Sequence, residues 1–232
     1  MTDRGTDQGT DRRTVRPAMV IASGNPGKLR ELQAMLQPLN WQVHSQDEWN
    51  IVEAVEDGLS FVENALIKAR HAAALCGLPA LGDDSGLVVD ALAGAPGIRS
   101  ARYAEALVGA HAEDHVGHRA GHRVGHRADD AANNQKLLDA LHGLPEEQRS
   151  AHFYCAMVFV RHATDPAPLI TLGKWDGSIL PAPRGTGGFG YDPLFWLAQQ
   201  QCASAELQPA EKNRISHRGQ ALAAMVELLR SL

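Results

Sequence analysis

The stretch from Phe153 to Val160 limits the fold of this 232-residue chain more than any other, because it is an almost unbroken apolar run. Such a run is typical of a strand that lies at the centre of a sheet and is buried on both faces. Weaker or shorter strand-like runs occur at residues 20–22, 87–89, 169–172 and 178–180.

Four segments between these runs have the apolar spacing and end signals of helices. The first follows Asn25, a good N-cap, and has Pro26 at its first helical position. The second starts with a capping box at Ser60 and runs to Cys76, before Gly77. The third covers about residues 130–142 and the fourth begins after Ser216. Because helices and strands interleave, the sequence predicts an α/β fold.

The charge and cysteine content exclude several classes of protein. The formal net charge is −5, so long-range attraction to nucleic acid is not expected, and a polyphosphate would need a local cluster of cations. Three scattered cysteines without a C-x-x-C pair argue against a disulfide framework or a zinc site and for a reducing cytoplasm. A polar N-terminus and the lack of an 18-residue apolar run predict neither a signal peptide nor a membrane span.

Two low-complexity segments flank or interrupt the predicted domain, which covers residues 19–232. Residues 1–18 form a polar repeat that is predicted to be a disordered tail. Residues from about 105 to 129 contain three Gly-His-Arg repeats and five histidines in all. A metal-binding tract is one interpretation, but a flexible surface insertion is favoured, because a loop rich in Gly and Ala gives a metal no fixed geometry.

Two helix starts carry cations where the helix dipole favours anions. Lys28 lies in the first turn of the first helix, and His217 with Arg218 in the first turn of the last. The cations are either solvated or turned toward a shared polyanion. Because cations occur at two helix starts and not at one, the second interpretation is favoured. The loop 23–28 that precedes Leu29 resembles a phosphate-binding loop but lacks the spacer and the Ser or Thr of a Walker A motif.

Two adjacent carboxylates, Asp83 and Asp84, lie between apolar runs and are flanked by glycines. We expect them at a sharp strand end, as either a polar turn or a metal site. The sequence favours the metal site, because neighbouring carboxylates at such a place are costly without a cation. Glu56, just before the second helix, can add a further acid. Magnesium is the metal expected, since it prefers one or two carboxylates together with phosphate oxygens.

Two further segments point to a ligand. The segment 185–190 matches G-x-G-x-x-G by letter, but Pro193 is badly placed for the helix that a dinucleotide fingerprint must open. It fits either a tight hairpin or a close backbone approach to a ligand with an aromatic ring to stack on a base. The basic segment 211–219 precedes an apolar helix, and a solvated face and a phosphate or base contact have equal weight there.

Taken together, these segments resemble the inosine/xanthosine triphosphate pyrophosphatase family over nearly all of residues 20–232. The motifs that carry the resemblance occur in one order: residues 23–28, 61–65 with 68–69, 83–86, 94–97, 100–103, 187–193 and 216–219. Each motif is weak alone, but their order is specific. The tail and the His-rich insertion depart from the family pattern, and Val55 stands where some relatives carry a further acid.

The resemblance implies roles for individual residues. Asp84 is implied as general base and magnesium ligand, with Asp83 and Glu56 supporting the metal. The triphosphate and base contacts implied are Ser23, Gly24, Asn25, Pro26, Gly27, Lys28, Lys68, Ser85, Phe189, Gly190, Tyr191, Asp192, Lys212, His217 and Arg218. The implied fold is an elongated mixed β-sheet flanked by helices, in two lobes with a cleft between them.

The resemblance also implies an activity: Mg²⁺-dependent hydrolysis of non-standard purine nucleoside triphosphates (inosine, deoxyinosine and xanthosine triphosphates) to the monophosphate and pyrophosphate, by a cytoplasmic homodimer. Three alternatives remain. A related pyrophosphatase would prefer modified pyrimidines, and a nucleotide sensor would need a damaged acid pair, whereas Asp83 and Asp84 are both present. A nucleic-acid-binding module fits the Arg/His repeats but not the net charge.

Overall fold

A single mixed sheet organises the chain in the computed structural model, which describes residues 17–105 and 126–231. Its seven strands lie in the order β2-β1-β3-β4-β5-β6-β7. Strand β1 pairs in parallel with β2 and β3, and all the pairs from β3 to β7 are antiparallel. The strands are β1 (Ala18–Ala22), β2 (Gln42–Ser45), β3 (Ala80–Val89), β4 (Ser150–Val160), β5 (Leu169–Ile179), β6 (Phe195–Leu197) and β7 (Cys202–Ala203).

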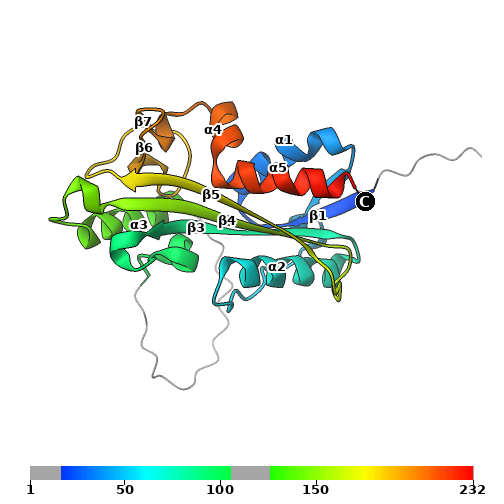
Figure 1. The fold of residues 1–232 in the computed structure, drawn as a ribbon. Helices are drawn as coiled ribbons and strands as arrows, with labels where there is room; N and C mark the ends of the chain where they lie inside the picture. Colours follow the sequence, from blue (N-terminus) through cyan, green and yellow to red (C-terminus); the bar gives the residue numbers. More distant parts are fainter. Residues whose placement is uncertain (1–16, 106–125, 232) are drawn as a thin grey trace, which may run out of the picture.

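Helices cover both faces of the sheet (Figure 1). Helices α1 (Pro26–Leu36) and α5 (His217–Leu229) lie on one face, and α2 (Phe61–Cys76) lies on the opposite face. Helix α3 (His126–Ala140) packs on the half of β3, β4 and β5 that lies away from β1, and α4 (Pro209–Ile215) leads into α5. None of the helices in the described ranges combines the length and apolar character that a membrane span requires.

The core divides along the long strands in a way that fits two lobes. Leu32, Met157 and Leu222 belong to a cluster between the sheet and the pair α1 and α5, and Ala65 and Val158 to a cluster under α2. A third cluster at the far half of β3, β4 and β5 includes Leu137, Phe153 and Phe195. Strands of 10 and 11 residues therefore connect two separately packed halves, as the predicted elongated α/β fold requires.

Most predicted elements are confirmed, and four differ. The two weak runs at 169–172 and 178–180 are parts of one strand, β5. Asp83 and Asp84 lie within β3, whereas the sequence favoured a strand end, because β3 begins at Ala80 and pairs with β4 along its whole length. Helix α3 begins at His126, before the predicted residue 130, and the ordered fold begins with β1 at Ala18. Residues 1–16 and 106–125, to which most of the predicted tail and insertion belong, lie outside the described residues.

Candidate active site

The loop from Ser23 to Lys28 joins β1 to α1 at one end of a cavity. Asn25 caps the helix as predicted, since its Oδ1 accepts hydrogen bonds from the amides of Gly27 (2.9 Å) and Lys28 (3.2 Å). Lys28, the cation in the first turn, is 3.0 Å from Asp83 Oδ2 through its Nζ. The helix start therefore presents a lysine and the positive end of the helix dipole to the same region, which is an arrangement that suits a phosphate group.

Asp83 and Asp84 point to opposite faces of the sheet, because successive side chains of a strand alternate. Asp83 lies on the face of α1 and α5, is 1% exposed, and pairs with Lys28 and with Nε of Arg218 at 3.6 Å. Burial alone would raise the pKa of Asp83, but the charges of Lys28, Arg218 and Lys68 hold it well below its usual range. Asp83 is therefore a charged counter-ion for two cations, and it does not lie with Asp84 and Glu56.

Asp84 faces α2, where three side chains surround it. Its Oδ1 is 2.8 Å from Lys68 Nζ, its Oδ2 accepts a hydrogen bond from Asn64 at 3.3 Å, and Glu56 Oε1 is 3.4 Å from the same Lys68 Nζ. Burial raises the pKa of Asp84, and the attraction of Lys68 and Lys28 offsets this only in part. A carboxylate with a raised pKa in a cavity is a candidate for proton transfer.

Two glycines on the Asp84 face of β3 shape the notch that holds this carboxylate. A Cβ at Gly82 would collide with the carbonyl oxygen of Ala65 in α2. A Cβ at Gly86 would collide with the carbonyl oxygen of Gly97 in the 3-10 helix η4 (Gly97–Arg102). Glycine at both positions therefore lets α2 and η4 approach the strand on either side of Asp84.

Asp192 organises the other end of the cavity. One of its oxygens lies 2.5 Å from Lys212 Nζ and accepts a hydrogen bond from the Phe189 amide at 2.8 Å. The other accepts from Ser204 Oγ at 2.8 Å. Lys212 Nζ in turn lies 5.0 Å from the centre of the Phe189 ring. This end presents an aromatic ring, a cation and backbone groups, which are the features that a nucleobase needs for stacking and hydrogen bonding.

Gly190, between Phe189 and Tyr191, is fixed by hydrogen bonds of both its amide and its carbonyl group with side chains of α3. Its amide donates to Asp130 Oδ2 at 2.8 Å, and its carbonyl oxygen accepts from Asn134 Nδ2 at 3.0 Å. The buried Tyr191 hydroxyl donates to the Ser100 carbonyl oxygen at 2.8 Å, and burial raises its pKa. The glycine-rich loop is thus a fixed wall of the cavity, as a close approach to a ligand requires.

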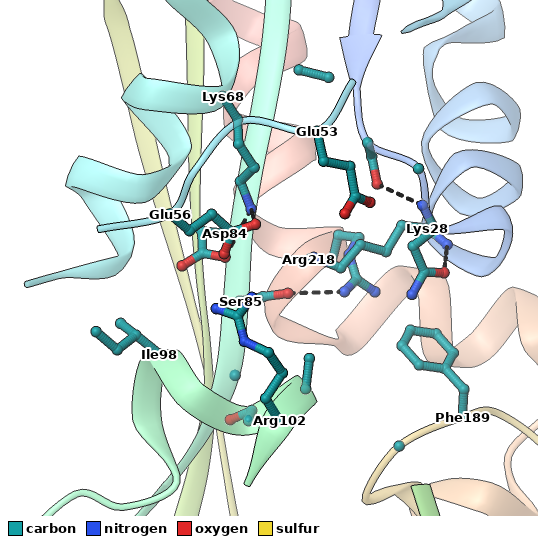
Figure 2. Close-up of a pocket in the computed structure, with 18 of the residues that line it drawn as sticks. Lys28, Glu53, Glu56, Lys68, Asp84, Ser85, Ile98, Arg102, Phe189 and Arg218 are labelled. Atoms are coloured by element: carbon teal, nitrogen blue, oxygen red, sulfur yellow. Dashed lines mark hydrogen bonds and ion pairs between the residues drawn. The ribbon is translucent and has the colours of Figure 1, made fainter. Parts of the chain in front are cut away.

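His217 and Arg218 begin α5 and are both buried. The His217 ring stacks on Phe153 with a centroid distance of 4.8 Å and an interplanar angle of 10°. Arg218 donates to Glu31 Oε2 and to Ser85 Oγ, the latter at 3.1 Å (Figure 2). Arg218, the cation at this helix start, is therefore not solvated, which excludes the simpler of the two interpretations of the sequence.

We expect His217 to make stability depend on pH. Burial lowers the pKa of His217 well below its ordinary value, and the charges of Arg218, Lys212 and Lys28 add to this against the opposing pull of Asp83. The unfolded chain takes up a proton near pH 6.5, but the native state does not, so acidification favours unfolding by up to about 1.4 kcal/mol per pH unit. His217→Phe should remove this part of the slope between about pH 7 and pH 5.

Urea denaturation at several pH values measures this slope. The same substitution at His142, which is exposed, is the matched control and should leave the slope as in the wild type. Equal slopes for the wild type and His217→Phe would contradict the assignment of a neutral buried imidazole.

A cavity of about 530 Å³ connects these groups. Of the sequence-predicted site residues, all but Gly27 and Asp83 line it. The cavity is also lined by residues to which the sequence assigned no role, including Gln46, Glu53, His71, Ile98, Arg102, Asp130 and Phe153. Arg102 lies in the motif 100–103 that the family resemblance includes, so this motif could have marked Arg102 as a site residue. No local sequence pattern identifies Glu53 or His71 as cavity residues.

The charges on the cavity wall are balanced among the residues that the structure describes. The basic side chains are Lys28, Lys68, Arg102, Lys212 and Arg218, and the acidic ones are Glu53, Glu56, Asp84, Asp130 and Asp192. A polyphosphate brings several negative charges into this balanced wall, so its binding calls for an added positive charge.

Residues 19–228 match the model of the Ham1 family. The chain is 50% identical over 204 residues to the dITP/XTP pyrophosphatase of Vibrio cholerae, covering 88% of this chain and 92% of that protein. It is 51% identical over 211 residues to the dITP/XTP pyrophosphatase of Pseudomonas aeruginosa, covering 91% and 96%. The structure of a HAM1 protein from Coxiella burnetii superposes with a TM-score of 0.78 at 44% identity, covering 93% of this chain and all of that one.

Proposed function

This chain belongs to the Ham1 family, and we propose from that premise that it hydrolyses non-standard purine nucleoside triphosphates, such as those of inosine and xanthosine, to the monophosphate and pyrophosphate. One observation carries the proposal: a single cavity joins a raised-pKa carboxylate, a helix start with a lysine, and an aromatic ring beside an Asp–Lys pair. These are a base for water, a phosphate cradle and a nucleobase pocket.

The proposed reaction is attack of water on the α-phosphorus. Asp84 accepts a proton from the water while the water oxygen forms a bond to the α-phosphorus. The bond between the α-phosphorus and the oxygen that bridges the α- and β-phosphates breaks. Lys28 and the positive end of the α1 dipole stabilise the pyrophosphate that leaves. Lys68, 2.8 Å from Asp84, keeps the carboxylate oriented. The proton on Asp84 then passes to solvent.

The residues present fit the magnesium ion that the family resemblance implies. In the part of the chain that the structure describes, no cluster of three or more acidic, histidine or cysteine ligands occurs. Asp84 and Glu56, which meet at Lys68, supply two carboxylates, and magnesium needs no more when phosphate oxygens complete its shell. When bound, the ion would offset the charge that the polyphosphate adds to the balanced cavity wall.

We expect Glu56→Gln to raise the Mg²⁺ concentration for half-maximal activity by about tenfold or more, because one of two carboxylate ligands is lost. A magnesium titration of the initial rate, after removal of metal with EDTA, measures this. Asp57→Asn is the matched control, since the adjacent carboxyl is exposed and does not line the cavity. An unchanged magnesium requirement in Glu56→Gln would remove Glu56 from the proposed site.

Selectivity for deaminated purines is proposed to arise at Asp192, Lys212 and the backbone around Phe189. A 6-oxo group accepts hydrogen bonds that a lysine or an amide can donate, whereas the 6-amino group of adenine is itself a donor and would face those donors with no acceptor between them. Donor mismatches of this kind discriminate more strongly than differences in size.

A substrate panel tests the proposed function. Initial rates with magnesium are compared for the triphosphates of inosine, xanthosine, adenosine, guanosine and modified pyrimidines. Preference for inosine and xanthosine supports the proposal. Preference for a pyrimidine would replace the base-pocket assignment with that of a related pyrophosphatase, and binding without turnover of any of them would place the protein among nucleotide sensors.

The cytoplasmic location and the homodimer are also part of the proposal. The three cysteines are all free, which supports a reducing compartment. The homodimer rests on the family resemblance, and sedimentation equilibrium of the purified chain tests it.

A further inference from the structure

Arg102 differs from the other basic side chains on the cavity wall. Each of the others pairs with a carboxylate: Lys28 with Asp83, Lys68 with Asp84, Lys212 with Asp192 and Arg218 with Glu31. Among the side chains that the structure describes (residues 17–37, 39–105 and 130–231), the guanidinium of Arg102 makes neither an ion pair nor a hydrogen bond. The proposed mechanism gives it no task, although it lines the cavity.

The backbone that carries Arg102 is fixed to the strand that carries Asp84. Helix η4 packs directly on Gly86, two residues beyond Asp84, where any side chain would collide with it. Ser100 Oγ in η4 accepts a hydrogen bond from the Leu87 amide at 2.8 Å. The position of Arg102 relative to Asp84 is therefore set by contacts to β3.

Two further contacts hold η4 from the side of the base pocket and of α3. The Tyr191 hydroxyl donates to the Ser100 carbonyl oxygen at 2.8 Å, and Asn133 Nδ2 donates to the Ala101 carbonyl oxygen at 3.2 Å. A rigid support of this kind is what a group needs if it is to meet a reacting atom in a defined geometry.

The side chain of Arg102 extends from η4 into the cavity toward Ser85 and Asp84 (Figure 2). A general base must lie next to the phosphorus that is attacked, so the group that Arg102 approaches is the reacting phosphate and not the far end of the triphosphate. The planar guanidinium can donate two parallel hydrogen bonds to phosphate oxygens, which a lysine cannot do.

We propose that Arg102 is a catalytic residue, whose guanidinium binds the non-bridging oxygens of the α-phosphate and stabilises the charge that they carry in the transition state. The inference rests on the proposed function and adds a residue to its machinery. Arg102 is free to do this because no carboxylate in the described chain neutralises it, whereas the other four cations also have structural partners.

Arg102→Ala, assayed for pyrophosphate release from inosine triphosphate with magnesium, tests the inference. We expect kcat to fall by about 10²- to 10³-fold, as on loss of a single donor to a transition-state oxyanion. Arg102→Lys should recover only part of the rate, because it restores the charge but not the paired donors. Arg99→Ala is the matched control: it removes the same charge from the same η4, but Arg99 is exposed and does not line the cavity.

A second readout separates a chemical role from a structural one. Millimolar guanidinium added to Arg102→Ala should restore part of kcat, and it should not raise the rate of Arg99→Ala or of the wild type. A rate within threefold of the wild type, or a loss that accompanies a lowered melting temperature and does not respond to guanidinium, would overturn the inference. Because the wild type is assayed beside the variants, failure of the proposed function itself would be seen separately, as absence of pyrophosphate from every sample.

Discussion

Asp84→Asn is expected to lower kcat by about 10³-fold or more while the protein stays folded. The substitution removes the group that accepts the proton from the attacking water and also one of the two carboxylates available to magnesium. An amide of the same shape still accepts a hydrogen bond from Lys68 but turns an NH₂ group toward the Asn64 donor, so it loses one contact. Because its size is unchanged, the notch between α2 and η4 should remain. The measurement is the single-turnover rate of inosine triphosphate hydrolysis, with circular dichroism to check the fold.

Asp176→Asn is the matched control for this experiment. Asp176 lies on β5, its side chain is 74% exposed, and it pairs with Lys174, a residue of the same strand. The same loss of charge there should leave the rate unchanged. A near-normal rate in Asp84→Asn would show that another group activates the water, and it would remove the basis for placing the reaction centre on this face of β3.

Asp83→Asn is expected to destabilise the fold by about 3–5 kcal/mol, the cost of leaving buried charges without their partner. Its neighbours Lys28 and Arg218 come from α1 and α5, so Asp83 holds the starts of both helices against the sheet. Chemical denaturation measures the change in the free energy of unfolding. The exposed Asp176→Asn serves again as the control and should have no effect on stability.

A double-mutant cycle with Lys28→Met identifies the cause of this loss. If the ion pair is responsible, Asp83→Asn should cost less in the Lys28→Met background than in the wild type, because one uncompensated cation has then been removed. Equal costs in both backgrounds would contradict the role of Asp83 as counter-ion.

The main elements of this fold could be predicted because their signals are local. The apolar run at Phe153–Val160 became β4, Asn25 and Pro26 start α1, and Ser60 caps α2. In each case a few adjacent residues determine the structure through burial, capping or a fixed backbone angle.

The site could be predicted only in part, because its geometry depends on contacts between distant segments. Aspartates are depleted in strands, so the sequence placed Asp83 and Asp84 at a strand end, but Lys28 and Arg218 stabilise Asp83 in the middle of β3. Alternation along that strand then separates the two acids, which a motif written in letters does not reveal. Arg102 likewise stands out only when the partners of the other four cations on the cavity wall are known, since among the described side chains it has none.

Hydrolysis of inosine triphosphate in water enriched in ¹⁸O, with the products separated and their masses measured by mass spectrometry, shows which phosphorus the water attacks. We expect one ¹⁸O atom in inosine monophosphate and none in pyrophosphate, because water attacks the α-phosphorus beside Asp84. Label in pyrophosphate, or release of inorganic phosphate with inosine diphosphate, would contradict it, since attack would then fall on a different phosphorus.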